Sequence, residues 1–100
     1  MRPAPYPPPR CLAIDVDGVL LVRGQIDQRV VDHARLRISE GWDVYVWSSR
    51  GRAHAERACK MAGLDVYAIS KPGYILDDKG WSWTRFTHVL PIGVLGAIDR

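Results

Sequence analysis

The sequence predicts an α/β fold with three layers and a mostly parallel sheet, and two observations lead to it. Short apolar runs alternate along the chain with longer amphipathic segments, the order that produces parallel strands joined by right-handed helical crossovers. The chain has 100 residues, of which 47% are hydrophobic and 25% charged. This is the composition of one ordinary soluble domain.

The first strand and a hairpin are predicted near the start of the chain. An apolar run over residues 11–14 ends at Asp15, which is typical of a buried strand. Residues 19–25 combine β-branched side chains with Gly24 and therefore favour a tight hairpin or flap.

Two helices are predicted, and each is followed by a glycine. The first covers about 28–40, with Asp27 as its N-cap and apolar residues recurring every fourth position. The second covers about 52–62. Gly41 and Gly63 follow these segments, at the position where glycine commonly ends a helix.

Further apolar segments predict the rest of the sheet. Strands are expected over 43–47, 64–69 and 74–76, and residues 88–92 are a candidate edge strand. Residues 81–86 have no regular pattern, and we expect them to be irregular.

Residues 1–10 contain five of the seven prolines, and we expect them to form a flexible leader before a single domain over 11–100. The chain has no apolar run near the roughly 20 residues of a membrane helix, and its N-terminus lacks the apolar segment of a secretory signal. Cys11 and Cys59 form neither a disulfide framework nor a CxxC pair. We therefore expect reduced thiols in a cytoplasmic protein without a membrane span.

Polar side chains stand where four of the predicted strands end. In chain order they are Asp15, Asp17, Ser48, Lys71, Asp77 and Asp78. Each has an ordinary explanation alone, in a turn, a helix cap or a solvated loop. Because the carboxyl ends of parallel strands share one edge, we expect all six side chains in one crevice. Two carboxylates 4 Å apart repel by about 4 kcal/mol at an effective dielectric of 20, so the cluster requires a cation, and Mg²⁺ suits oxygen ligands beside a phosphate.

The same residues resemble the motifs of the haloacid dehalogenase (HAD) superfamily of phosphatases and phosphotransferases. The four matches, in order, are Asp15-Val16-Asp17-Gly18-Val19, Ser48 ahead of Ser49-Arg50, Lys71, and Asp77-Asp78. The resemblance covers residues 11 to about 80 and implies a Rossmann-like fold. Predicted helices and strands fill the segments between the motifs, so we expect no cap domain.

The resemblance implies a role for each matching residue. Asp15 is the implied nucleophile, which forms an aspartyl-phosphate, and Asp17 the implied general acid and base. Ser48 and Lys71 are implied to bind phosphate oxygens, with Lys71 as a compact positive charge.

Backbone and metal contacts follow from the same resemblance. The N–H groups of Val16 and Asp17 are implied to complete the phosphate cradle, and Gly18 lets the chain turn away beside the phosphate. Ser49 and Arg50 are candidate substrate contacts. The implied ligands of Mg²⁺ are the Asp15 carboxylate, the Asp17 carbonyl oxygen and Asp78, with Asp77 reaching the ion through water.

Together these features predict a Mg²⁺-dependent phosphohydrolase that cleaves a phosphomonoester. The formal net charge of +3 and the uncapped site favour a nucleotide or a nucleic-acid end, with a second subunit or partner protein covering the crevice. Two alternatives stay open: a weakly active or inactive module that binds phosphate or a partner, and a phosphotransferase. Dehalogenation is disfavoured, because members of the superfamily with that activity generally lack the acid at Asp17.

Other polar and aromatic residues have less specific expectations. Arg50 and Arg52 are candidates for a second phosphate contact or for local backbone caps, and Trp81 and Trp83 for base stacking or packing. The histidines show no metal-ligand spacing, and we expect all three to be structural or on the surface. They are His33, His54 and His88.

Overall fold

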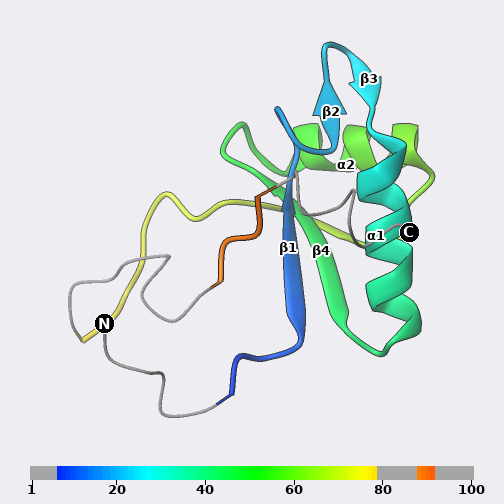
Figure 1. Ribbon diagram of the computed structural model, residues 1–100. Helices are drawn as coiled ribbons and strands as arrows, with labels where there is room; N and C mark the ends of the chain where they lie inside the picture. Colours follow the sequence, from blue (N-terminus) through cyan, green and yellow to red (C-terminus); the bar gives the residue numbers. More distant parts are fainter. Residues whose placement is uncertain (1–6, 79–87, 92–100) are drawn as a thin grey trace.

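Three of the apolar runs pair into one parallel sheet in the order β1-β4-β5 (Figure 1). Its strands are β1 (Cys11–Asp15), β4 (Asp43–Ser48) and β5 (Tyr67–Ser70). This computed structural model describes residues 7–78 and 88–91. Within those ranges, no helix is both long and apolar enough to cross a membrane. The predictions for residues 81–86, and for the first six residues of the leader, lie outside them.

Both predicted helices are present, as α1 (Gln28–Ser39) and α2 (Arg52–Ala62). Asp27 caps α1, because its Oδ1 accepts a hydrogen bond of 3.0 Å from the backbone N–H of Arg29. Gly63 ends α2 with a φ of 68°, a left-handed conformation that glycine adopts without a steric penalty.

The predicted tight hairpin is confirmed by two short antiparallel strands, β2 (Leu21–Val22) and β3 (Gln25–Ile26). Arg23 and Gly24 connect them with φ angles of 53° and 75°. Positive φ at both central residues is the requirement of the tight hairpin turn whose twist matches that of its strands. The hairpin rises beyond the carboxyl end of β1 (Figure 1).

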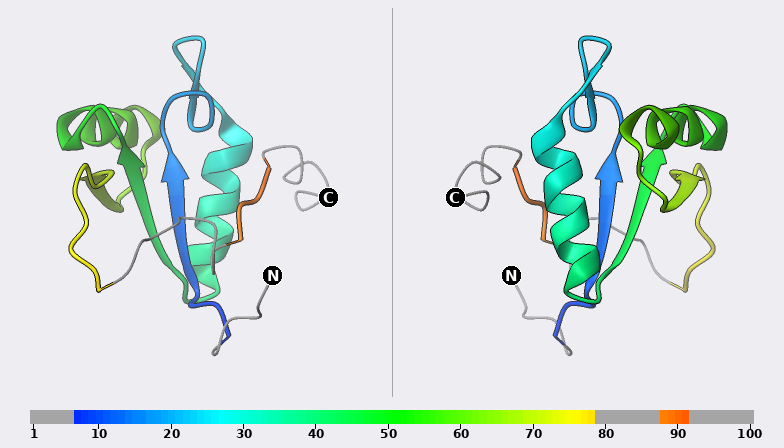
Figure 2. Two further views of the ribbon diagram at one scale, coloured as in Figure 1. Left: turned by 90° about the vertical axis from the view of Figure 1, so that its left-hand side faces the viewer. Right: turned by 90° about the vertical axis from the view of Figure 1, so that its right-hand side faces the viewer.

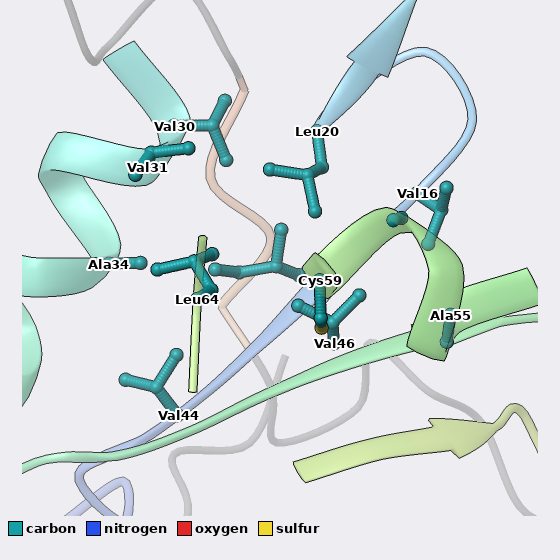
Figure 3. Packing of buried hydrophobic residues seen from close by; sticks show 12 residues of the cluster. Val16, Leu20, Val30, Val31, Ala34, Val44, Val46, Ala55, Cys59 and Leu64 are labelled. Carbon is teal, nitrogen blue, oxygen red and sulfur yellow. The ribbon is translucent and has the colours of Figure 1, made fainter. Parts of the chain in front are cut away.

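The helices cover one face of the sheet (Figure 2). Along β4, Val44 and Val46 are buried, whereas Tyr45 and Trp47 on the other face are only half-buried. The buried cluster joins side chains of both helices to these valines, as Figure 3 shows for most of its members. It comprises Ile14, Val16, Leu20, Val30, Val31, Ala34, Val44, Val46, Ala55, Ala58, Cys59 and Leu64. The α/β class and the parallel sheet are therefore confirmed, and the described residues form two layers.

The predicted strand over 74–76 is wrong, since residues 71–78 contain neither helix nor strand. Tyr74 is 98% exposed, so this segment has no sheet neighbour to bury it. The apolar run is only three residues long, and Pro72 just before it lacks a backbone donor for pairing. The described part of the candidate edge strand, 88–91, likewise lies outside any strand.

The third strand of the sheet is shorter than predicted. It starts at Tyr67 rather than at residue 64, because Leu64 turns inward after Gly63 and is buried in the core. Its end is close to the predicted one, at Ser70.

Candidate functional site

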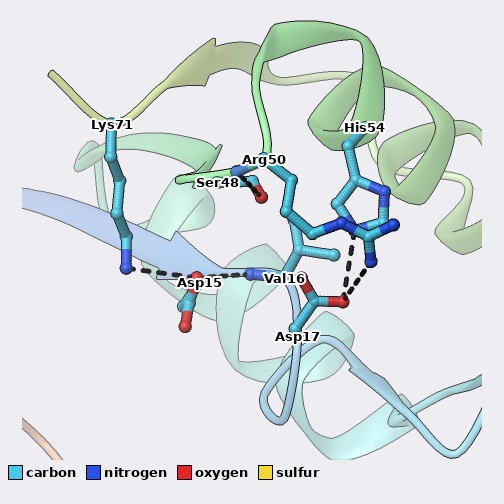
Figure 4. Close-up of polar contacts among 7 residues, drawn as sticks. All are labelled: Asp15, Val16, Asp17, Ser48, Arg50, His54 and Lys71. Atoms are coloured by element: carbon cyan, nitrogen blue, oxygen red, sulfur yellow. Dashed lines mark hydrogen bonds and ion pairs between the residues drawn. The ribbon is translucent and has the colours of Figure 1, made fainter. Parts of the chain in front are cut away.

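The first part of the site is an ion pair between Asp15 and Lys71 at the carboxyl ends of the strands (Figure 4). Asp15 is the last residue of β1 and faces away from the helices, because the preceding Ile14 is in the core. Lys71 directly follows β5, and its Nζ lies 3.3 Å from Oδ1 of Asp15. The same Oδ1 accepts a 3.0 Å hydrogen bond from the backbone N–H of Val16. The strand ends predicted that these two residues share a crevice, and the structure brings their side chains together.

An aromatic pair lies beneath this ion pair. Trp47 is the register partner of Asp15, and Nζ of Lys71 lies 5.4 Å from the centre of the Trp47 ring. Tyr45 packs edge-on against Trp47, with ring centres 5.6 Å apart and ring planes at 88°. An ammonium at this distance from an indole ring is attracted to its face, so Trp47 helps to place Lys71 across the end of β4.

The second part of the site surrounds Asp17, on the side of α2 (Figure 4). Oδ1 of Asp17 lies 3.2 Å from Nε2 of His54 and 3.5 Å from Nη1 of Arg50. The imidazole of His54 is 12% exposed, whereas the Arg50 side chain is 64% exposed. Asp15 and Asp17 are thus held by different partners on two sides of the end of β1.

The contact of His54 with an acid of the first motif was not predicted from the sequence. A search for metal-ligand spacing among the histidines could not find it, because the partner is a single carboxylate 37 residues away. The sequence did contain one signal for this contact, namely the place of His54 just after a predicted strand. His54 lies in the first turn of the helix that follows β4, and that turn stands at the carboxyl edge of a parallel sheet.

Ser48 lies between the two parts but takes part in local structure. Ser48 is buried, with only 1% of its surface exposed. Its Oγ accepts a 3.0 Å hydrogen bond from the backbone N–H of Arg50. Its carbonyl oxygen accepts from the N–H groups of Gly51, at 3.1 Å, and Lys71, at 3.0 Å. The hydroxyl predicted to bind phosphate therefore serves, in this structure, the turn between β4 and α2.

The predicted backbone cradle is partly used by the loop itself. The N–H of Val16, which is fully buried, is donated to Asp15, and the N–H of Gly18 is donated to the carbonyl oxygen of Leu21 at 2.9 Å. Gly18 has a φ of 82°, which explains the glycine at this turn. Ser49 and Arg50 are both exposed at the same edge, where a ligand can reach them.

The two acids of the fourth motif are not brought to this edge. Asp77 and Asp78 are exposed, at the end of a segment that runs away from the carboxyl ends of the strands after Lys71 (yellow in Figures 1 and 2). No strand forms over 74–76 to carry them back into the sheet.

The predicted ligands fit a magnesium ion only in part. Asp15 and Asp17 stand together at the end of β1, but Asp78, the third expected ligand, lies elsewhere. Among residues 7–78 and 88–91, no group of three or more His, Cys, Asp or Glu side chains is placed to hold a metal ion. We therefore derive no chemical step through the ion.

Neither cysteine has the lowered pKa of a reactive thiol. Burial raises the pKa of the Cys59 thiol, and the nearby Glu56 adds to the shift. Burial also raises the pKa of Cys11, with a further contribution from Asp43. Since the thiolate is the reactive form, a raised pKa makes each thiol less reactive.

Comparison with known proteins did not identify a relative of this chain. We found no match to this chain among models of protein families, curated proteins or solved structures. The resemblance to the HAD superfamily accordingly depends on the motif residues alone.

Proposed function

We propose that this protein is a HAD-like phosphohydrolase that transfers the phosphoryl group of a phosphomonoester first to Asp15 and then to water. The observation that carries the proposal is the Asp15–Lys71 ion pair at the carboxyl edge of a parallel sheet. The residues of the first three motifs, which lie at that edge, add support.

The contacts of Asp15 indicate which of its oxygens attacks. Oδ1 is engaged by Lys71 and by the N–H of Val16, whereas no described residue makes such a contact with Oδ2. Oδ2 is then the nucleophile that bonds to phosphorus. The bond from phosphorus to the leaving oxygen breaks, and that oxygen takes a proton from Asp17.

The second step returns the site to its starting state. A water molecule attacks the phosphorus of the aspartyl-phosphate and gives a proton to Asp17. The bond between phosphorus and Oδ2 breaks, inorganic phosphate leaves, and Asp15 is again a carboxylate.

Charge at the edge explains why a cation is part of the proposal. In the first step Asp17 carries the proton that it donates, so the two positive charges of Lys71 and Arg50 face the negative charge of Asp15 and the two of a dianionic substrate, which leaves one negative charge without a partner. Magnesium, when bound, would supply positive charge to the phosphoryl oxygens. We propose Mg²⁺ as the cofactor on that ground.

The openness of the site supports a large substrate. No described residue forms a cap over the carboxyl edge, and the chain has a formal net charge of +3. We propose a nucleotide or a nucleic-acid end as the phosphomonoester, in a cytoplasmic protein whose site is covered by a second subunit or a partner. A phosphoryl acceptor other than water is compatible with the same opening, and added alcohols would reveal it as phosphorylated products.

A second candidate, a module that binds phosphate without turnover, is favoured by the placement of Asp77 and Asp78. Without an acid of the fourth motif at the edge, the residues present can still bind an anion through Lys71 and Arg50.

Hydrolysis of an aryl phosphate in the presence of Mg²⁺ tests the proposed function. Asp15→Asn should lower kcat at least about 100-fold, because it removes the nucleophile. Chelation of the metal should abolish turnover, and Mg²⁺ should restore it. The matched control is Asp65→Asn, an exposed acid near the other end of the sheet, which should keep full activity. Equal turnover by the parent and Asp15→Asn would refute the aspartyl-phosphate route, and tight phosphate binding without turnover would support the binding module.

A further inference from the structure

We propose that His54 is a positioning residue that holds the carboxyl group of Asp17 for proton exchange with the substrate. The proposal rests on the proposed function, in which Asp17 is the general acid and base. It goes beyond that function because His54 belongs to none of the four motifs.

The position of the imidazole is fixed by α2. His54 is the third residue of that helix, whose first turn is closed by a 3.3 Å hydrogen bond from the N–H of Ala55 to the carbonyl oxygen of Gly51. The ring is only 12% exposed, so it has little freedom to move. Asp17 is 49% exposed and lies in the loop after β1, where its own surroundings restrain it less.

The chemistry of the contact determines its direction. With the exchanging proton on Oδ2, Oδ1 of Asp17 accepts hydrogen bonds whether the group is protonated or not, so Nε2 of His54 carries the hydrogen and donates it to Oδ1 over 3.2 Å. Figure 4 shows the imidazole and the carboxylate facing each other from α2 and from the loop after β1.

Arg50 contacts the same oxygen but is the weaker restraint. Its Nη1 lies 3.5 Å from Oδ1 of Asp17, and its side chain is 64% exposed. An ion pair between two such exposed side chains is screened by water and contributes little. His54, which is closer and largely buried, is therefore the residue that sets the orientation of Asp17.

The consequence is that the two oxygens of Asp17 are not equivalent. The contacts from His54 and Arg50 both fall on Oδ1, and no described residue makes one with Oδ2. Oδ2 is then the oxygen that exchanges a proton with the leaving group or with water. A carboxyl group misplaced by about 1 Å can lose about 100-fold in rate, so a fixed orientation matters for catalysis.

The test compares two substrates that differ in the acidity of the leaving group. His54→Phe keeps the ring and removes the donor. It should lower kcat/KM, which reports the step that expels the leaving group, about 10- to 100-fold on an alkyl phosphate, whose leaving oxygen needs a proton. On nitrophenyl phosphate, whose nitrophenolate leaves readily without a proton, kcat/KM should fall no more than about 3-fold. KM for the alkyl phosphate should be unchanged.

Rescue by a conservative variant separates positioning from a purely structural role. His54→Gln retains an N–H donor at a similar reach and should recover most of the alkyl phosphatase activity. Arg57→Ala is the matched control, because Arg57 is an exposed residue of the same helix and takes no part in the contacts of Asp17. It should leave both substrates unaffected.

Each outcome decides the question. Folding of every variant is checked by thermal unfolding, and His54→Ala replaces His54→Phe should the larger ring prevent folding. In a folded variant, an equal loss of kcat/KM on both substrates, or no loss on either, would overturn the role of His54. The proposed function would still stand in that case, provided that turnover by the parent depends on Asp15. A parent without Asp15-dependent turnover would overturn the proposed function, and the role of His54 with it.

Discussion

Asp15 ends β1 and Lys71 follows β5, 56 positions later in the chain, yet they meet because β1 and β5 flank the same central strand. Their closeness was predictable from the sequence, since the carboxyl ends of parallel strands lie at the same edge of the sheet. The contact of Asp17 with His54 was not, because it depends on how far around the first turn of α2 each side chain points.

Removal of the Lys71 charge is predicted to affect activity far more than stability. Lys71→Met keeps a long side chain over the Trp47 ring but should lower kcat about 100-fold or more, because a fixed positive charge at the phosphoryl group is lost. Both partners are partly exposed, so the free energy of unfolding should change by less than about 1 kcal/mol.

Activity measurements and urea unfolding check this prediction together. Lys60→Met, on the exposed face of α2, is the matched control and should change neither quantity. A Lys71→Met variant with parental kcat would show that the ammonium has no part in the reaction.

The bounds of the two helices were predicted almost to the residue, whereas the strand predicted over 74–76 does not form. A helix is specified locally, by a cap such as Asp27, an apolar period and a closing glycine. A strand needs a partner from elsewhere in the chain, and the three apolar residues over 74–76 do not identify one. The placement of Asp77 and Asp78 failed for the same reason, because it was derived from that strand.

The cap of α1 is predicted to stabilise the fold measurably. Asp27→Ala should lower the free energy of unfolding by about 1 kcal/mol, since it leaves the N–H of Arg29 without its acceptor. Urea unfolding measures the change, and Asp32→Ala, an exposed acid within α1, is the control expected to cost less. Equal effects of the two substitutions would contradict the capping role.

The same cap has a predictable pH dependence. The hydrogen bond from the Arg29 side chain, with smaller contributions from the backbone and from charge attraction, lowers the pKa of Asp27 in the folded state. A lowered pKa means that this stabilisation is complete above the ordinary pKa of an aspartate and is lost as the pH falls through the lower folded value. The difference in stability between the parent and Asp27→Ala should accordingly be constant near neutral pH and shrink in acid.

The turn between β2 and β3 leads to a prediction about Gly24. Gly24 has a φ of 75°, and nothing lies within 4 Å of the place that an alanine methyl group would take, so any cost of Gly24→Ala comes from the backbone alone. That cost should be about 1 kcal/mol. Gly73→Ala is the matched control, because that glycine is also uncrowded and has no positive φ. Thermal unfolding that shows no difference between them would contradict the left-handed turn.

Across the whole molecule, the described residues place all helical cover on one side of the sheet. The opposite face carries the half-buried Tyr45 and Trp47 together with Tyr67 and Ile69, both exposed. The sequence predicted a sheet with helices but could not assign faces, because residues on both faces of β4 are apolar. The ion pair of Asp15 and Lys71 lies on this less covered side, which accounts for its access to solvent.

One residue at the end of the central strand joins the two halves of the site. The side chain of Ser48 supports the backbone of Arg50, and its carbonyl supports the backbone of Lys71. A substitution that shifts this residue would displace the cations of both acids at once. A mutation at this position would therefore alter the surroundings of Asp15 and of Asp17 together.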